Sequence, residues 1–297
     1  MAKVRIMCTS SGAVQFAPER YQKYDIDIIS LHIAFKGVER LEKDVDPQEF
    51  YSQLETLEDP RNNLPKTSLP SVAEFKEHFD KAIEDGCDTI IVFTLSTGLS
   101  GTYGVACSVA KEYEGKIKIH VVDTKTAAFC EGIHAVKAAE MLEKGMSVED
   151  VLKETDWAIA HQEFLGTDAK LDYLIYNGRL KGAKAFMGKM LKICPVLQFS
   201  RDGFLEAVES VRTQKKAIAR MCERVIDLIG DRKPEDYILF RVFTGAAMEE
   251  ALIEAEAKTG LKPNHESVVM TPSSGSHNGP WLGAYGLYML RREDEAL

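Results

Sequence analysis

The chain has 297 residues, of which 45% are hydrophobic and 28% charged, a composition typical of a folded globular protein and not of a disordered one. Its formal net charge of -9 argues against broad nucleic-acid binding, which depends on clustered Lys and Arg side chains. No run approaches the roughly 18 apolar residues of a membrane span, and the first residues lack the apolar region of a signal peptide. We therefore expect a soluble, cytoplasmic protein that has no transmembrane segment and binds no nucleic acid.

Four short apolar runs, rich in β-branched residues, mark the first half as a series of strands. They lie at residues 4–8, 26–35, 88–95 and 118–123, and helical patterns separate the later ones. This alternation predicts βαβ units around a largely parallel sheet. The clearest helix spans residues 71–86, because Ser71 and Glu74 form a capping box at its start and Gly86 ends it.

The sequence pattern changes beyond about residue 145, where Ser147 and Asp150 predict the start of another capped helix. Apolar runs at 193–199 and 204–211 flank an Asp-Gly turn and predict a hairpin. A helix at 215–229, a strand at 237–243, a helix at 246–258 and a strand at 267–271 follow. We predict two α/β domains, residues 1–160 with a largely parallel sheet and residues 161–297 with a mixed one, and a ligand bound between them.

The strongest candidate site is the stretch 95–103, Leu-Ser-Thr-Gly-Leu-Ser-Gly-Thr-Tyr, which directly follows an apolar strand. Ligands of open α/β sheets bind at the carboxyl ends of strands, where a turn rich in hydroxyls and glycine offers O–H and free N–H donors. The stretch is neither a phosphate-binding P-loop nor a serine-hydrolase elbow, since Thr102 stands where the elbow needs glycine. It predicts an anion cradle around Ser100, although an ordinary helix cap explains Ser100 equally well.

Three other candidates are weaker by themselves. Thr67 approaches the helix that Ser71 caps, and turn chemistry alone can explain its hydroxyl. His277 lies in a glycine-bracketed segment that we predict to be a loop, where a histidine is more often structural than a ligand. Arg179 follows an Asn-Gly turn and is by default a solvated charge.

These segments together resemble the DegV family of bacterial fatty-acid-binding proteins, over essentially the full length of the chain. The matching segments are Thr67 to Ser71 with Thr-Ser-x-Pro-Ser, Ser96 to Tyr103 with Ser-x-Gly-Leu-Ser-Gly-Thr-Tyr, Asp123-Thr124 with Asp-Ser/Thr, Asn177 to Arg179 with Gly-Gly-Arg, and His277 to Trp281 with His-Thr-Gly-Pro-Gly. Three departures stand out: Cys8-Thr9-Ser10 replaces Thr-Asp-Ser, Asn278 replaces a Thr, and Trp281 replaces a Gly.

The resemblance implies a non-catalytic carrier that buries one long-chain fatty acid. It places the carboxyl on Thr67, Ser100, the N–H of Gly101, and His277. It also implies that the acid is presented to a separate, ATP-dependent fatty acid kinase of the Dak type, for acyl-phosphate formation and phospholipid synthesis. We expect Arg179 and Arg212 to contact that kinase or to neutralise the acyl phosphate, although a surface charge near a helix explains Arg212 equally well. We expect Arg179 to do so without contributing to fatty-acid binding.

Two other functions remain open from the sequence: a serine acyl hydrolase using Ser100 and His277, and a binder of another small carboxylate or phosphate. Six dispersed cysteines and seven histidines show no metal-ligand spacing, so we predict no metal and no cofactor beyond a bound fatty acid. Candidates for the lining of the acyl tail, each also explicable as core, are Phe186, Met187, Met190, Leu191, Ile193 and Val196.

Overall fold

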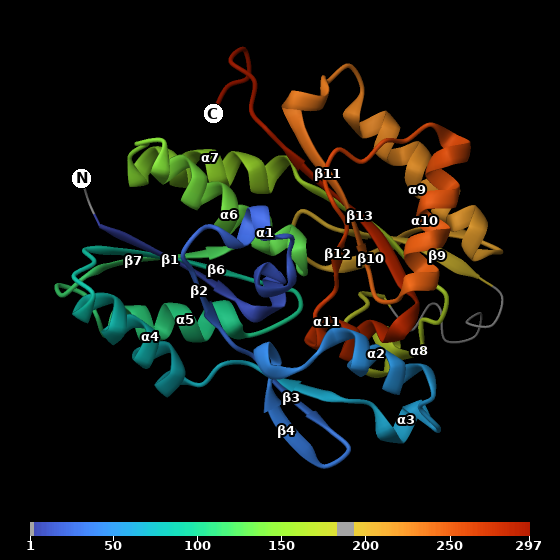
Figure 1. Cartoon of the computed structure of the whole chain (residues 1–297), viewed down its shortest axis with the longest axis horizontal. Helices are drawn as coiled ribbons and strands as arrows, with labels where there is room; N and C mark the ends of the chain where they lie inside the picture. Colours follow the sequence, from blue (N-terminus) through green and yellow to red (C-terminus); the bar gives the residue numbers. More distant parts are fainter. Residues whose placement is uncertain (1–2, 183–192) are drawn as a thin grey trace.

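The computed structural model describes residues 3–182 and 193–297. The first half of the chain contains a four-stranded parallel sheet. Its strands run in the order β2 (Ile26–Ile29), β1 (Val4–Thr9), β6 (Thr89–Thr94) and β7 (Lys118–Asp123). All three pairings are parallel. Helices α4 (Val72–Glu84) and α5 (Thr102–Lys111) cover one face, and α6 (Phe129–Glu143) and α7 (Val148–His161) lie on the other side (Figure 1).

The second half contains a six-stranded mixed sheet. Its order is β10 (Leu205–Val211), β9 (Cys194–Phe199), β8 (Glu163–Asp168), β13 (Leu282–Met289), β11 (Tyr237–Phe243) and β12 (Val268–Val269). Its pairs are antiparallel except for β11 with β12. Helices α9 (Gln214–Ile229) and α10 (Ala246–Thr259) pack on it, as Figure 1 shows. The mixed α/β fold predicted from the sequence is thus confirmed.

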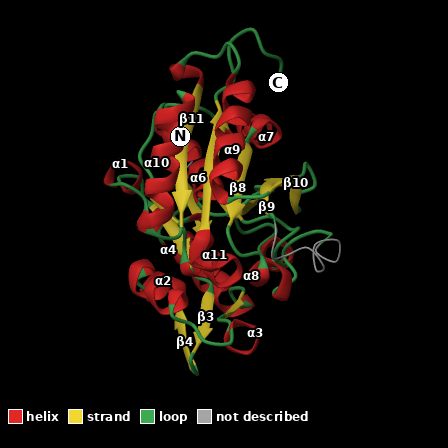
Figure 2. Cartoon of the chain, turned by 90° about the vertical axis from the view of Figure 1, so that its right-hand side faces the viewer, coloured by secondary structure: helices red, strands yellow, loops and turns green. Residues whose placement is uncertain are grey.

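A small three-stranded antiparallel sheet projects at the bottom of the molecule in Figures 1 and 2. It consists of β4 (Val38–Leu41), β3 (His32–Phe35) and β5 (Lys66–Ser68). The sequence predicts a single strand over 26–35, and this is wrong. The chain leaves the parallel sheet at Leu31, whose N–H donates to Ser10 Oγ at 2.9 Å and whose carbonyl accepts from Glu42 at 2.8 Å.

Short helices connect these sheets. They are α1 (Glu19–Gln22), α2 (Pro47–Glu55), α3 (Pro60–Asn63), α8 (Asp172–Tyr176) and α11 (Pro272–Asn278). The segment around His277, predicted as a loop, is helix α11, because Pro272 occupies the first turn and the Thr271 side chain accepts from the Ser274 N–H. Within the described ranges no helix is long and apolar enough to cross a membrane.

Helix α6 packs between the two larger sheets and joins their cores. It contacts β1 and β6 on one side and β13 on the other. Phe129 meets Phe240 of β11 edge to face, with ring centroids 5.1 Å apart. Because one hydrophobic core continues across both halves, the packing does not itself mark a boundary. The division into residues 1–160 and 161–297 therefore stays a proposal.

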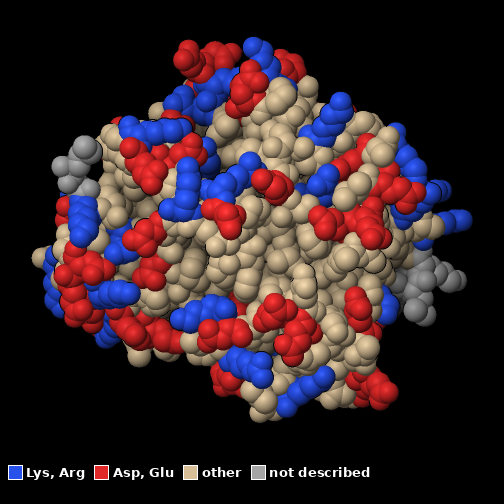
Figure 3. All heavy atoms as spheres, viewed as in Figure 1, with Lys and Arg blue, Asp and Glu red and all other residues tan. Residues whose placement is uncertain are grey.

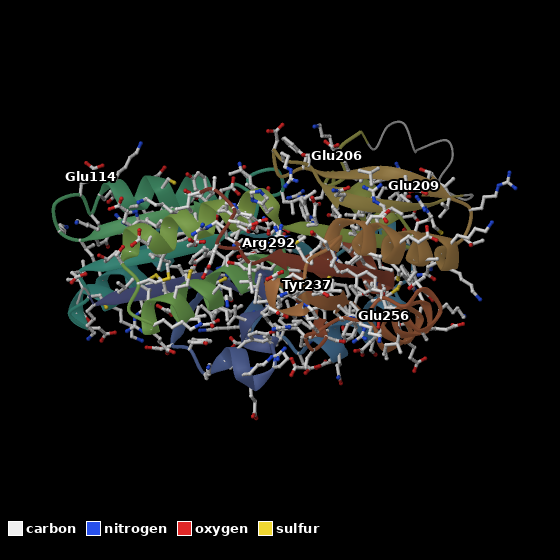
Figure 4. All side chains as sticks on the ribbon, turned by 90° about the horizontal axis from the view of Figure 1, so that it is seen from above. Glu114, Glu206, Glu209, Tyr237, Glu256 and Arg292 are labelled. Carbon is white, nitrogen blue, oxygen red and sulfur yellow. The ribbon has the colours of Figure 1, made fainter. Side chains whose placement is uncertain are left out.

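The surface carries mixed charges. On the face in Figure 3, Lys and Arg are interspersed with Asp and Glu. The edge strand β10 presents Glu206 and Glu209, labelled in Figure 4, which pair with Lys181 and Arg220 at 2.7 and 2.8 Å. Charged side chains on an exposed edge disfavour pairing with other strands.

Candidate functional site

A cavity of about 600 Å³ lies at the carboxyl end of β6. It is lined by the loop that follows β6, by residues of β5 from the small sheet and of β8, β9, β10 and β13 from the mixed sheet, and by α8 and α11. Among the lining residues are the four expected to bind the ligand: Thr67, Ser100, Gly101 and His277. The volume falls within the range of about 300 to 1,000 Å³ that is usual for small-molecule sites. The cavity therefore brings together expected ligand residues that are up to 210 positions apart in the sequence.

Thr67 and His277 form a hydrogen-bonded pair at the polar part of this cavity. Thr67 lies in the middle of β5 and His277 near the end of α11, and Thr67 Oγ1 is 2.9 Å from His277 Nε2. Burial lowers the pKa of His277 from 6.5 to about 4, and the charge of Arg179 adds to this effect. The imidazole is consequently neutral at neutral pH. Its Nδ1 atom is buried without a hydrogen-bond partner among the described residues.

Ser100 and Gly101 provide further donors from the loop that enters α5. Ser100 Oγ lies 2.8 Å from Thr102 Oγ1 and accepts a long hydrogen bond, 3.4 Å, from the Thr102 N–H. Ser100 is therefore not the N-cap of α5, which the ordinary explanation of its hydroxyl required, because the helix begins one residue later and has no side-chain cap. Gly101 is the N-cap residue of α5, and within residues 3–182 and 193–297 its N–H donates no hydrogen bond. A free N–H at a helix N-terminus is suited to an anionic group.

The two arginines differ in position. Arg179 is half-buried, lines the cavity, and donates through Nη1 to the Asn177 carbonyl at 2.6 Å. Arg212 is exposed and does not line the cavity. The structure thus brings Arg179, but not Arg212, to the predicted ligand residues.

The rest of the cavity wall is mainly apolar. The larger apolar side chains in it are Leu31, Leu69, Leu95, Leu99, Phe164, Leu174, Phe199, Leu205, Met270 and Leu282. Of the six residues predicted from the sequence to line the tail, the structure describes two, and neither lines the cavity. Val196 is fully buried in the core and does not line the cavity, nor does Ile193. Phe186, Met187, Met190 and Leu191 lie outside the described residues.

A contact between the β6–α5 loop and the β9–β10 turn closes one side of the cavity. Ser96 Oγ donates to the Gly203 carbonyl at 2.6 Å, and the Gly98 N–H donates to Ser96 Oγ at 3.1 Å. A Cβ atom on Gly98 would lie 2.7 Å from the carbonyl carbon of Gly203. Glycine is thus required at position 98 by close backbone approach, a role that the sequence pattern alone does not reveal.

Asp123, the last residue of β7 and the first of the Asp-Thr pair, holds this loop. Its carboxylate accepts from Thr97 Oγ1 at 2.7 Å and from the Lys125 N–H at 3.1 Å, and it pairs with Lys125 Nζ at 2.8 Å. Asp123 therefore supports the loop that bears Ser100.

Behind the cavity lie two buried carboxyl groups that the sequence analysis missed. Glu42 and Glu131 are fully buried, and the side chains around the segment Cys8-Thr9-Ser10 hold them. Ser10 bonds to Glu42, while Thr9, Ser11 and Cys8 bond to Glu131. Burial raises the pKa of both carboxyls, that of Glu131 to about 8. The three consecutive hydroxyl residues 9–11 at the end of an apolar run are the sequence signal from which buried polar partners could have been predicted.

The two departures near His277 have different surroundings. Asn278 lines the cavity, and its amide lies 3.7 Å from Met270 Sδ. Trp281 packs edge to face on Tyr173, and Lys170 Nζ lies 3.6 Å from the centroid of the Trp281 ring system. Trp281 therefore packs against the segment around α8 and does not line the cavity.

Comparison with known proteins gives consistent matches over nearly the whole chain. A fatty acid-binding protein of Thermotoga maritima is 32% identical over 98% of this chain and 99% of its own. A fatty acid binding DegV family protein from Streptococcus agalactiae is 25% identical and superimposes with a TM-score of 0.87, covering 98% of this chain and 100% of that one.

A third relative, described as a stearic acid-binding protein from Eubacterium ventriosum, is 26% identical with a TM-score of 0.83, over 97% of this chain and 98% of its own. The DegV family model matches residues 3–291. The chain therefore belongs to the DegV family.

Proposed function

We propose that this protein binds one long-chain fatty acid in the cavity, with the carboxyl group at Thr67, Ser100, Gly101 and His277. The observation that carries the proposal is the Thr67–His277 pair in the wall of a largely apolar cavity. The Gly101 N–H, which donates to no other described residue, lies in the same wall. The relatives described as binding fatty acids, one of them stearic acid, support the same ligand class.

The donors of the site match the needs of a carboxylate. A carboxylate offers about four acceptor positions, and bonds from N–H or O–H groups to an ionised acceptor are stronger than bonds between neutral groups. A neutral His277 protonated on Nε2 donates to Thr67 Oγ1, which leaves the Thr67 hydroxyl proton for the ligand. The guanidinium of Arg179 in the same wall favours the ionised form of the acid.

The tail supplies most of the affinity in this proposal. Each buried CH₂ group gains about 0.8 kcal/mol, so a tail of some sixteen carbons gains far more than the head group. The aromatic and aliphatic wall formed by Phe164, Phe199, Leu205 and Leu282 is suited to this segment. The carboxyl donors then determine the position of the acid along the cavity.

We further propose that the protein is a non-catalytic carrier that presents the acid to a separate ATP-dependent kinase. The chain has no phosphate-binding loop of its own, and in the described residues no group of three or more His, Cys, Asp or Glu can hold a metal ion. In this proposal Arg212, exposed and away from the cavity, contacts the kinase only. Arg179 lines the cavity and lies near His277. We therefore replace the expectation that it contributes nothing to fatty-acid binding and propose a second role for it there.

A serine hydrolase has less support from the geometry. The described partner of Ser100 Oγ is Thr102, and that of the His277 imidazole is Thr67. A serine nucleophile instead needs its general base within hydrogen-bond reach.

The test is to purify the protein, extract it with organic solvent and quantify acyl chains by mass spectrometry. We expect one fatty acid per chain, with occupancy reduced by Thr67→Ala or Ser100→Ala. The control is Ser108→Ala, which removes an exposed helix hydroxyl whose partner among the described residues is the Gly104 carbonyl. Empty protein that also fails to take up added fatty acid would refute the proposal.

A further inference from the structure

Helix α11, which carries His277, is only seven residues long and is held by side chains from distant parts of the chain. It lies beside α2 and α8 (Figure 1). Tyr51 of α2 donates to the carbonyl groups of Met270 and Thr271 at 3.1 and 3.0 Å, just before the helix begins. Asn177, after α8, donates to the Ser276 carbonyl at 3.1 Å. So short a helix depends on such contacts for its position.

The contact at the start of the helix comes from Glu42. This residue begins the short 3-10 helix Glu42–Asp44 and has no exposed surface. Its Oε1 accepts the backbone N–H of Ser273, in the first turn of α11, at 2.6 Å. Its Oε2 bonds to the hydroxyl of Ser10, which follows β1. One carboxyl group thus connects the end of the parallel sheet with the helix that carries His277.

The directions of these bonds identify the Glu42 carboxyl as an acceptor on both sides. The N–H groups of Ser273 and Leu31 can only donate, and Leu31 donates to Ser10 Oγ at 2.9 Å. Because Ser10 Oγ accepts the hydrogen bond from the Leu31 N–H, the Ser10 hydroxyl proton is available to donate to Glu42 Oε2. Removing this buried carboxyl would leave the Ser273 N–H and the Ser10 hydroxyl without their acceptor, at a cost in free energy. Its hydrogen bonds therefore hold these two segments in position.

We propose that Glu42 is a positioning residue for ligand binding: by joining Ser10 to the first turn of α11, it sets the position of His277 relative to Thr67. The inference rests on the proposed fatty-acid function. Glu42 does not line the cavity, so it acts through Ser273 and α11. The cavity wall includes Ser273 itself, the residue whose N–H Glu42 binds.

The experiment compares two ligands in delipidated protein, hexadecanoic acid and hexadecanol, which share a tail and differ in the head group. For Glu42→Gln we expect affinity for the acid to fall roughly tenfold, the equivalent of one hydrogen bond, and affinity for the alcohol to change less than about twofold. Ser10→Ala, a milder change that removes one of the two partners, should reduce affinity for the acid by a smaller factor. Glu39→Gln, on the exposed strand β4, is the control and should match the wild type.

The outcomes separate the two proposals. Equal affinity of wild type and both variants for the acid would overturn the role of Glu42 while leaving fatty-acid binding intact. Equal loss of acid and alcohol binding would also overturn it, because that result indicates general damage to the cavity. Failure of the wild type to bind the acid would refute the proposed function. In that case amide hydrogen exchange still tests the anchoring: unchanged protection of residues 273–278 in Glu42→Gln would overturn it as well.

Discussion

Replacement of Gly98 by alanine tests the contact between the two halves of the chain at the cavity. The new Cβ would lie 2.7 Å from the Gly203 carbonyl carbon, whereas ordinary contact begins at 3.4 Å. The β9–β10 turn must therefore retreat by about 0.7 Å or more, in an interior that is closely packed. Such a shift stretches the 2.6 Å bond from Ser96 Oγ to the Gly203 carbonyl.

Two costs add in this variant. Overpacking a tight site costs about 1–3 kcal/mol, and weakening a buried hydrogen bond costs about 1 kcal/mol more, so we expect a loss of about 2–4 kcal/mol. For 297 residues the unfolding entropy is about 0.6 kcal/mol/K, and Tm should fall by about 3–6 °C.

Calorimetry on delipidated protein measures this change, since bound ligand would itself raise Tm. The matched control is Gly104→Ala in α5, where a Cβ meets nothing within 4 Å. Alanine there should stabilise the helix by about 0.5–1 kcal/mol. The steric reasoning is refuted if Gly98→Ala melts at or above the wild-type temperature.

Three further predictions concern charge. Arg212→Ala should slow phosphorylation of the bound acid by a partner kinase without changing fatty-acid affinity, whereas Arg179→Ala should lower both the phosphorylation rate and the affinity. Calorimetric titration with hexadecanoate distinguishes the two variants, and a loss of affinity in Arg212→Ala would contradict the assignment. The pKa of His277 is about 4 when folded and 6.5 when unfolded, so the unfolded state binds more protons between these values and the wild type loses stability as pH falls. Relative to His277→Gln, it should be about 2 kcal/mol less stable at pH 5 than at pH 7 in urea unfolding, and parallel profiles would contradict this. Burial raises the pKa of Glu131 from 4.5 to about 8, so the folded state binds more protons than the unfolded state between these values. The wild type should therefore lose stability relative to Glu131→Gln as pH rises from 5 to 9. A difference in unfolding free energy that stays constant over this range would show that the carboxyl is already ionised.

Most secondary-structure elements were predictable because their signals are local. The capping box of Ser71 and Glu74 starts α4, and the Asp-Gly turn at Gly203 joins β9 to β10. Strand β6 is buried along its whole length, as its continuous apolar run indicates. The errors lie where tertiary contacts override local pattern, as at Leu31, where two hydrogen bonds redirect the chain.

The α/β class and the position of the hydroxyl-rich loop at the end of β6 were readable from the amino-acid sequence. The residues proposed to bind the ligand came from the family resemblance. These follow from patterns within a few residues or from a motif read along the chain. Three contacts could be seen only in the folded chain: Thr67 with His277, the β9–β10 turn with Gly98, and Glu42 with the first turn of α11. Each of these contacts joins side chains or backbone groups more than 100 positions apart, and no local pattern encodes which distant segments fold against one another.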